Sequence, residues 1–299
     1  MSNYKDLNGL TQAEYLDQYD MNKYEKPSIT TDIILLTIAD YQTDNYRKLS
    51  EKKMQVLLIK RKEHPYISQW AIPGGFVEMN ESIEQSAYRE LEEETGIKNV
   101  YLEQLYTFGS VDRDPRGRII STSYLSLVNK DEIKANPGSD AEEVAWFNLD
   151  YRCVKEERIM FKDGFDESKY YELLFSNKEI QLKARVKVCR HVKNGQISYK
   201  RTLESSTGLA FDHGIIIAQA IERLRSKLEY TDIVFHLMPN LFTLSELQIT
   251  YEEILDQPLL KANFRRKIAK MVIETDEMNS FGGHRPSKLY KFNPMWEAK

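Results

Sequence analysis

The sequence has few cysteines, no long apolar run and no excess of basic residues, and each absence excludes a class of protein. Its two cysteines, Cys153 and Cys189, lie far apart and outside any CxxC pattern. We therefore expect reduced, buried thiols, and neither a disulfide framework nor a zinc site. The net charge of −4 gives no general attraction to nucleic acid or anionic lipid, so DNA binding would require a local basic patch.

Targeting and membrane signals are also lacking. Apolar runs such as residues 33–39 are far shorter than the roughly 20 residues of a membrane-spanning helix. The first residues show no basic segment followed by an apolar core, which a secretory signal requires. We therefore expect a cytoplasmic protein that does not bind membranes.

The residues that are present predict an α/β protein with three parts. Hydrophobic residues make up 41% of the chain and charged residues 29%, which is typical of a globular protein. We expect an N-terminal arm over residues 1–25, a first domain over 26–229 and a second domain over 230–299. Apolar runs bounded by turn residues predict strands over residues 29–39, 56–62, 105–108, 119–128, 144–147, 184–191 and 196–203.

Other stretches predict loops and helices. Residues 40–53 and 70–75 are polar or carry turn chemistry. Apolar residues recur at helical spacing from residue 214 onward. Residues 150–206 are charge-rich, and the sequence leaves their role open.

A second helix is predicted over residues 82–95, and its acidic residues do not all lie on a polar face. Most charged residues on a helix are simply solvated. Here, however, Glu90 and Glu94 fall within the apolar stripe, and Glu93 lies about 60° to one side. Ser82 and Gln85 form a capping box at the start, and Gly96 suits the left-handed position at the end.

The grouping of three carboxylates on one arc predicts a cation site. Their charges repel one another, and burial raises carboxyl pKa values. A divalent cation such as Mg²⁺ relieves both effects, because it prefers carboxylate and phosphate oxygens. Arg89 precedes Glu93 by one turn and can hold that carboxylate through an i, i+4 pair.

Residues 75–97 resemble a complete Nudix box: Gly, five residues, Glu, seven residues, Arg-Glu, an aliphatic residue, any residue, Glu-Glu, any residue, Gly, an aliphatic residue. The matching residues are Gly75, Glu81, Arg89, Glu90, Leu91, Glu93, Glu94, Gly96 and Ile97. The resemblance implies an αβα sandwich that binds Mg²⁺ or Mn²⁺ and the pyrophosphate of a nucleoside diphosphate derivative. The alternative is a box retained only for the fold, as in family regulators that have lost catalysis.

The resemblance also assigns roles to the box residues, with the general base left open. Gly75 would border the ligand. The metal ligands would be Glu90, Glu93 and Glu94. The residues that take part in catalysis would be Glu81, Arg89, Glu93 and Glu94.

A basic loop follows the predicted strand at residues 105–108. Its sequence, DRDPRGR over residues 112–118, carries Arg113, Arg116 and Arg118, which either clamp an anion or form an exposed charged turn. The string resembles a loop of Nudix proteins that act on or sense ADP-ribose. Phe108, with Tyr106 and Trp70, would then stack on adenine, although a core role is the plainer interpretation of each aromatic residue. Residues 209–213 resemble the start of the second sandwich helix in the same subgroup. A lone histidine such as His213 is more often a structural cap than a catalyst.

The C-terminal part predicts a winged helix-turn-helix. A capping box at Thr243 and Glu246 opens one helix, a turn at residues 256–258 ends it, and residues 261–270 then hold five basic residues and no acidic one. Two short strands around a Gly-rich hairpin follow. The second helix would enter the major groove, and the wing would meet the minor groove or phosphate. The candidate DNA-binding residues are Asn263, Arg265, Arg266, Lys267, Lys270, Arg285 and Lys288. The alternative is a solvated helix in a module for dimerisation or for covering the substrate.

With both parts present, the chain resembles the NrtR family, in which a Nudix sensor is joined to a winged helix. The resemblance implies a homodimer that binds double-stranded, palindromic operators of NAD-synthesis or sugar-use genes and releases them when ADP-ribose binds. Two departures bear on this expectation. The box is intact where many such regulators have a degraded one, which favours retained hydrolysis in this chain. The stretch between residues 146 and 209 is longer than the family's usual connection, so the ligand could differ from ADP-ribose.

Three functions follow from these patterns. The leading one is a repressor that senses, and can also hydrolyse, ADP-ribose or a related nucleotide. The second is a Mg²⁺-dependent ADP-ribose pyrophosphatase whose C-terminal domain serves only in assembly. The third is a hydrolase that removes a different nucleotide.

Overall fold

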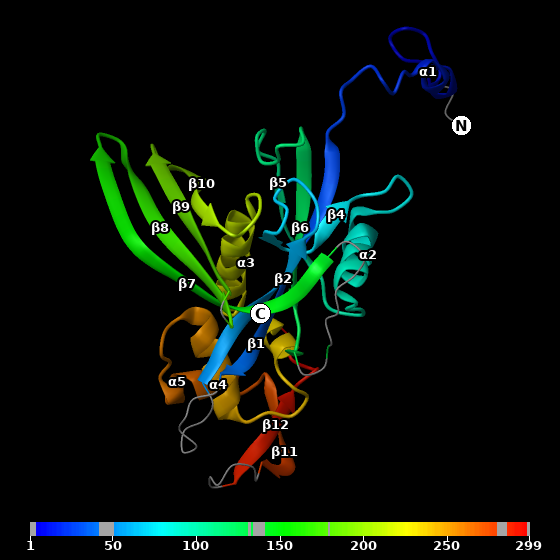
Figure 1. The fold of residues 1–299 in the computed structure, drawn as a ribbon. Helices are drawn as coiled ribbons and strands as arrows, with labels where there is room; N and C mark the ends of the chain where they lie inside the picture. Colours follow the sequence, from blue (N-terminus) through cyan, green and yellow to red (C-terminus); the bar gives the residue numbers. More distant parts are fainter. Residues whose placement is uncertain are drawn as a thin grey trace.

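The computed structural model of the chain has a large sheet, helices on both of its faces, and a small helical unit with its own hairpin (Figure 1). It describes residues 4–41, 51–130, 133, 141–178, 180–279 and 286–297. Within these residues, no helix combines the length and apolarity needed to cross a membrane.

The sheet has ten strands and places the N-terminal strand near its middle. Its order is β10-β9-β8-β7-β2-β1-β6-β5, with β3 on β2 and β4 on β1. The pairing of β1 with β6 is parallel and that of β1 with β2 antiparallel. The strands are β1 (Ser28–Tyr41), β2 (Glu51–Arg61), β3 (Trp70–Ala71), β4 (Gly74–Phe76), β5 (Glu103–Phe108), β6 (Ile119–Leu127), β7 (Ala141–Phe161), β8 (Gly164–Asn177), β9 (Ile180–Lys193) and β10 (Gln196–Thr207).

One face of β1 packs against helix α2 (Ile83–Thr95). Ile33 and Leu35 share a buried cluster with Ala87 and Leu91 of that helix. Alternate residues of a strand point to opposite faces, so the residues between them must be covered from the other side. The near-continuous apolar run of β1 reflects this double burial.

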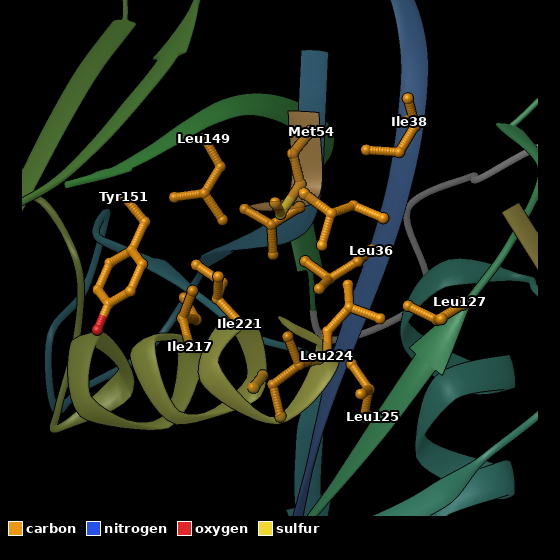
Figure 2. Packing of buried hydrophobic residues seen from close by; sticks show 14 of the residues in the cluster. Leu36, Ile38, Met54, Leu125, Leu127, Leu149, Tyr151, Ile217, Ile221 and Leu224 are labelled. Atoms are coloured by element: carbon orange, nitrogen blue, oxygen red, sulfur yellow. The ribbon is translucent and has the colours of Figure 1, made fainter. Parts of the chain in front are cut away.

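The other face of the sheet packs against helix α3 (His213–Lys227). Figure 2 shows Ile217, Ile221 and Leu224 of this helix beside Leu36 and Leu125 of the sheet. Two helices on opposite faces of one sheet form the αβα sandwich that the box implies, and this prediction is confirmed.

Strands β7 to β10 extend the sheet well beyond the sandwich (Figure 1). The prediction for residues 144–147 found only the start of β7, and β8 was missed. The predictions for residues 184–191 and 196–203 lie within β9 and β10. Side chains of β8 are mostly half-buried along both faces, so no apolar alternation marks that strand. Asn194 and Gly195 form the β9–β10 turn with φ of 50° and 79°, the conformation that an Asn-Gly hairpin requires.

Three smaller predictions need correction. Of the loop predicted over residues 40–53, residues 40–41 belong to β1 and residues 51–53 to β2, because these two segments pair with each other. Residues 42–50 lie outside the described residues. The turn predicted over residues 70–75 contains strands β3 and β4, which pair with β2 and β1. Cys153 is exposed and Cys189 half-buried, since both lie in the sheet extension, and both thiols are free.

The arm before β1 carries helix α1 (Gln12–Gln18), which begins with a capping box at Thr11 and Glu14. It projects away from the sandwich at the start of β1, and none of its residues is buried (Figure 1).

The C-terminal unit follows α3 through the 3₁₀ turn η2 (Ile233–Leu237). Its elements are α4 (Leu244–Leu255), α5 (Lys261–Ile268), β11 (Val272–Asn279) and β12 (Ser287–Phe292). One hydrophobic cluster runs from the sheet through Leu224 of α3 to Leu247 of α4 and Phe264 of α5. The predicted boundary at residue 230 therefore crosses a continuous core.

Candidate functional site

Helix α2 holds the carboxylates of the box as its sequence predicts. Ser82 accepts a hydrogen bond from the Gln85 N–H at 3.1 Å, and Gly96 ends the helix with φ of 72°. Glu90 and Glu94 are 9% and 7% exposed, so both lie on the packed face. Burial raises the pKa of Glu90.

The loop before α2 is built closely around these two side chains. The Gly74 N–H donates to Glu94 Oε2 at 2.6 Å. A Cβ on Gly75 would lie 2.2 Å from Glu90 Oε1, so any side chain at position 75 would force that carboxylate to move. A cavity of about 300 Å³ opens beside both carboxylates, and Arg61 and Phe76 also line it.

Arg89 donates hydrogen bonds to three acidic side chains of the box. Its guanidinium donates to Glu81 at 2.7 and 2.9 Å, to Glu90 at 2.7 Å and to Glu93 at 2.9 Å, the i, i+4 pair that the spacing predicts. It also donates to the Phe76 carbonyl at 3.1 Å. The hydrogen bonds from Arg89 lower the pKa of Glu81 to about 2. Arg89 therefore joins the loop to the helix.

The donor chemistry of this cavity suits a hard cation. Among the residues that the structure describes, no group of three or more His, Cys, Asp or Glu side chains is arranged to hold a metal ion. Glu90 and Glu94 nevertheless present carboxylates to one cavity, whereas Glu93 pairs with Arg89 and is half-exposed. Two carboxylates fit Mg²⁺, which commonly takes its other ligands from water and substrate phosphates.

The arginines of the basic loop have separate positions. Arg113 is buried and donates to both carboxylate oxygens of Asp212, at 2.7 and 3.0 Å. Arg116 donates to both oxygens of Asp114, also at 2.7 and 3.0 Å. Arg118 has no carboxylate partner of this kind among the described residues and donates instead to the backbone carbonyls of residues 109 and 110.

A second, smaller cavity of about 70 Å³ lies beside this loop. It shares Arg61 and Phe76 with the first cavity, and it is also lined by Arg113, Arg116 and Phe211. The two cavities therefore adjoin, and the basic loop faces the buried carboxylates of α2.

Sequence reasoning missed a buried acid that lies beside His213 in this second cavity. Asp32 lies in the middle of β1, accepts a hydrogen bond from Ser121, and has its pKa raised to about 6 by burial. His213 Nδ1 accepts the Ile72 N–H at 3.1 Å, and its Nε2 lies 4.0 Å from Asp32. Burial and the nearby Arg113 lower the pKa of His213 to about 3, so the ring is neutral. A lone acid in an apolar strand was the available signal.

The predicted aromatic residues lie elsewhere. Phe108 is buried in the hydrophobic core, as is Trp70. Tyr106 is exposed on β5 and contacts Phe108 edge-on at 5.2 Å. The aromatic side chains that line the cavities are Phe76 and Phe211, which the sequence patterns did not single out.

The C-terminal unit has the form of a helix-turn-helix with a wing. Asp256 ends α4 in the left-handed conformation, and Glu252 accepts the Leu259 N–H at 2.8 Å, which fixes the turn before α5. Phe264 and Ile268 are buried beneath α5. The side chains of α5 and the residues just after it that lie exposed include the predicted Asn263, Arg265, Arg266, Lys267 and Lys270.

Several predicted DNA-binding residues have partners within the unit. Arg266 donates to Asn263 at 3.2 Å. Lys267 places its ammonium 5.3 Å from the ring centre of Tyr251, and Lys288 of the wing pairs with Glu274. Arg285 lies outside the described residues.

The architecture agrees with the relatives of this chain. The model of the NUDIX domain matches residues 48–159, and that of the NrtR DNA-binding winged helix domain matches residues 234–292. The ADPR responsive transcriptional repressor NtrR of Acinetobacter baylyi is 30% identical over 96% of this chain and 90% of its own length. The chain belongs to the NrtR family.

Two solved structures extend this family likeness to the fold. The MutT/nudix family protein from Enterococcus faecalis has a TM-score of 0.67 and 30% identity, covering 95% of this chain and 94% of that one. Shewanella oneidensis NrtR complexed with a 27mer DNA has a TM-score of 0.58 and 28% identity, covering 89% and 94%.

Proposed function

We propose that this chain is a transcriptional repressor that binds operator DNA as a homodimer through its winged helix and senses ADP-ribose or a related nucleotide in its Nudix cavity. The observation that carries the proposal is the pairing of two unlike sites in one chain. A cavity lined by buried carboxylates and arginines lies in the sandwich, and an exposed basic helix lies in the C-terminal unit. The named function of the Acinetobacter relative, similar over nearly the whole chain, supports it.

The cavity suits a diphosphate between two charged walls. Arg61 and Arg116 provide guanidinium groups, which bind phosphate oxygens in pairs. Glu90, Glu93 and Glu94 would hold Mg²⁺ or Mn²⁺, with Glu90 and Glu94 already facing the cavity. When bound, the metal would neutralise phosphate charge and lower the pKa of a bound water. Arg89 would keep the carboxylates oriented, since it bonds three acidic side chains of the box.

Helix α3 offers the path from this cavity to the DNA-binding unit. Its N-terminal end adjoins the cavity, where Asp212 pairs with Arg113. Near its other end, Arg225 donates to the Ile254 carbonyl in the last turn of α4 at 2.7 Å. Because the turn after α4 leads directly into α5, a ligand that displaces Arg113 would shift the helix that meets DNA.

The test is DNA binding to the region upstream of the protein's own gene, measured by fluorescence anisotropy with and without ADP-ribose and Mg²⁺. We expect ADP-ribose to weaken binding in the parent protein, and to have a smaller effect in Arg225→Leu. The matched control is Arg223→Leu on the same helix, because Arg223 contacts β5 and not α4. Failure of the parent to bind DNA would remove the repressor function, whereas an unchanged ligand response in Arg225→Leu would remove only the proposed path.

The intact box favours a second activity, Mg²⁺-dependent hydrolysis of ADP-ribose to AMP and ribose 5-phosphate. Glu94 is buried, lines the cavity and accepts a hydrogen bond from the loop, so its carboxylate is fixed where a metal-bound diphosphate would lie. We expect turnover to be lost in Glu94→Gln. Equal turnover in both proteins would exclude Glu94 from catalysis, and a panel of nucleotides would show whether another substrate is preferred.

A further inference from the structure

Arg116 lies over two aromatic rings that line the smaller cavity. Its guanidinium carbon is 4.9 Å from the ring centre of Phe76 and 5.5 Å from that of Phe211. Phe76 ends β4, directly after the box glycine, and Phe211 precedes the first turn of α3. Two segments 135 positions apart thus place their rings beside one flat cation.

A guanidinium in this position occupies the place of a flat ligand. Like a nucleotide base, it is planar, and both groups stack on aromatic faces. We propose that Phe76 and Phe211 form the binding slot for the aromatic base of the nucleotide, and that Arg116 fills this slot until the base displaces it. This inference rests on the proposed nucleotide-sensing function and assigns a part of its ligand to named residues.

Phe211 is held rigidly enough to form one wall. It has φ of 51°, a conformation that costs a non-glycine residue free energy and persists only where the surroundings impose it. Tyr66 contacts its ring edge-on at 4.7 Å, and the guanidinium of Arg61 lies 5.1 Å from its centre. Arg61 is itself anchored, because its Nε donates to the Pro65 carbonyl at 2.8 Å.

The other wall, Phe76, is accessible to a ligand, and Arg116 can move out of the slot. Phe76 is 44% exposed, although it is a large apolar side chain beside a cavity. Arg116 is tied to the buried Asp114 but has a partly exposed side chain, so it can move to solvent or to a phosphate. Burial raises the pKa of the Asp114 carboxyl, but the hydrogen bonds and charge of Arg116 outweigh it and lower the pKa, and the charge of Arg113 lowers it further. Asp114 would therefore keep a cation nearby after Arg116 moves.

The position of the slot matches the order of groups in a nucleoside diphosphate. Phe76 lines both cavities, and the first of them contains the carboxylates of Glu90 and Glu94. A base stacked on Phe76 would therefore place its attached diphosphate toward those carboxylates.

Calorimetric titration of the full chain in Mg²⁺ tests the slot with three probes: ADP-ribose, ADP and inorganic pyrophosphate. We expect Phe211→Leu and Phe76→Leu each to weaken ADP-ribose and ADP by about tenfold, the scale of one base–aromatic stack, and to leave pyrophosphate within about twofold. Tyr199→Leu, which removes an exposed aromatic ring on β10, is the matched control and should leave all three probes unchanged. Circular dichroism of each variant verifies folding.

The outcomes separate the slot from the function on which it rests. Equal affinity of the parent and both slot variants for ADP-ribose and ADP would overturn the slot. An equal loss for pyrophosphate would also overturn it, because the rings would then act on the phosphate site. If ADP binds with the expected dependence on Phe211 while ADP-ribose leaves operator binding unchanged, the slot stands and ADP-ribose sensing fails. Binding of neither nucleotide overturns both.

Discussion

Helices α2 and α5 are both short and amphipathic, but α2 buries two of its charged side chains whereas α5 exposes its basic ones. On α2, Glu90 and Glu94 are turned inward, and each has a partner fixed by the loop or by Arg89. On α5, the basic side chains are exposed, and Arg266 donates to Asn263 on the same helix at 3.2 Å.

The difference indicates two kinds of recognition. Buried charges with fixed partners interact strongly over short distances in a region that excludes water, which suits a compact ligand. Exposed cations on long side chains interact weakly one by one and are screened by salt, which suits a long polyanion. Charge direction therefore distinguishes the nucleotide site from the DNA surface, although both helices carry several charges.

The largest expected effect on stability comes from Arg89→Ala. This change leaves the buried carboxylate of Glu90 without its cation. We expect a loss of about 2 kcal/mol in the free energy of unfolding, below the range for fully buried pairs because water reaches part of the Arg89 guanidinium. Urea unfolding measures it. Lys98→Ala is the control, since its pair with Glu92 at the end of the same helix is exposed, and the expected loss is below about 0.5 kcal/mol. Similar losses in the two variants would contradict the inward role of α2.

A smaller effect is expected for Arg266→Ala, and on DNA binding instead of folding. Losing one phosphate or base contact should weaken operator binding by about tenfold and lower the salt slope by about one. Anisotropy titrations at several salt concentrations measure both quantities. Lys162→Ala, at the tip of the β7–β8 hairpin, removes an equal charge elsewhere and should change neither. An unchanged slope in Arg266→Ala would show that α5 does not meet the DNA backbone at this residue.

The two helices also show which parts of the protein could be predicted from its sequence. The packed faces of α2 and α5 follow from helical spacing alone, because residues three and four positions apart share a face. Glu90, Glu94, Phe264 and Ile268 were all placed on the correct side in this way.

The second cavity could not be predicted from local spacing. Asp32, Phe211 and His213 meet only because β1 and the start of α3 cross the same end of the sandwich. No periodicity within either segment specifies that crossing. Strand β8 and most of β7 were missed for a different reason: the side chains of β8 are mostly half-buried along both faces, so no apolar alternation marks that strand.

The smallest expected effect tests the buried histidine by pH. The folded-state pKa of His213, about 3, lies below the ordinary value of 6.5, so the unfolded chain takes up the proton first as pH falls. The stability that His213 contributes is thus complete above pH 6.5 and is lost as pH falls toward 3. His213→Asn keeps an acceptor for the Ile72 N–H. When pH is lowered from 7.5 to 6.0, its free energy of unfolding should therefore fall by about 0.8 kcal/mol less than that of the parent, as measured by urea unfolding. Asp32→Asn should shift in the opposite sense, because a folded-state pKa raised to about 6 gives stability that is present at low pH and lost as pH rises. Shifts of the same sign in both variants would show either that His213 is not a buried, neutral ring or that the pKa of Asp32 is not raised.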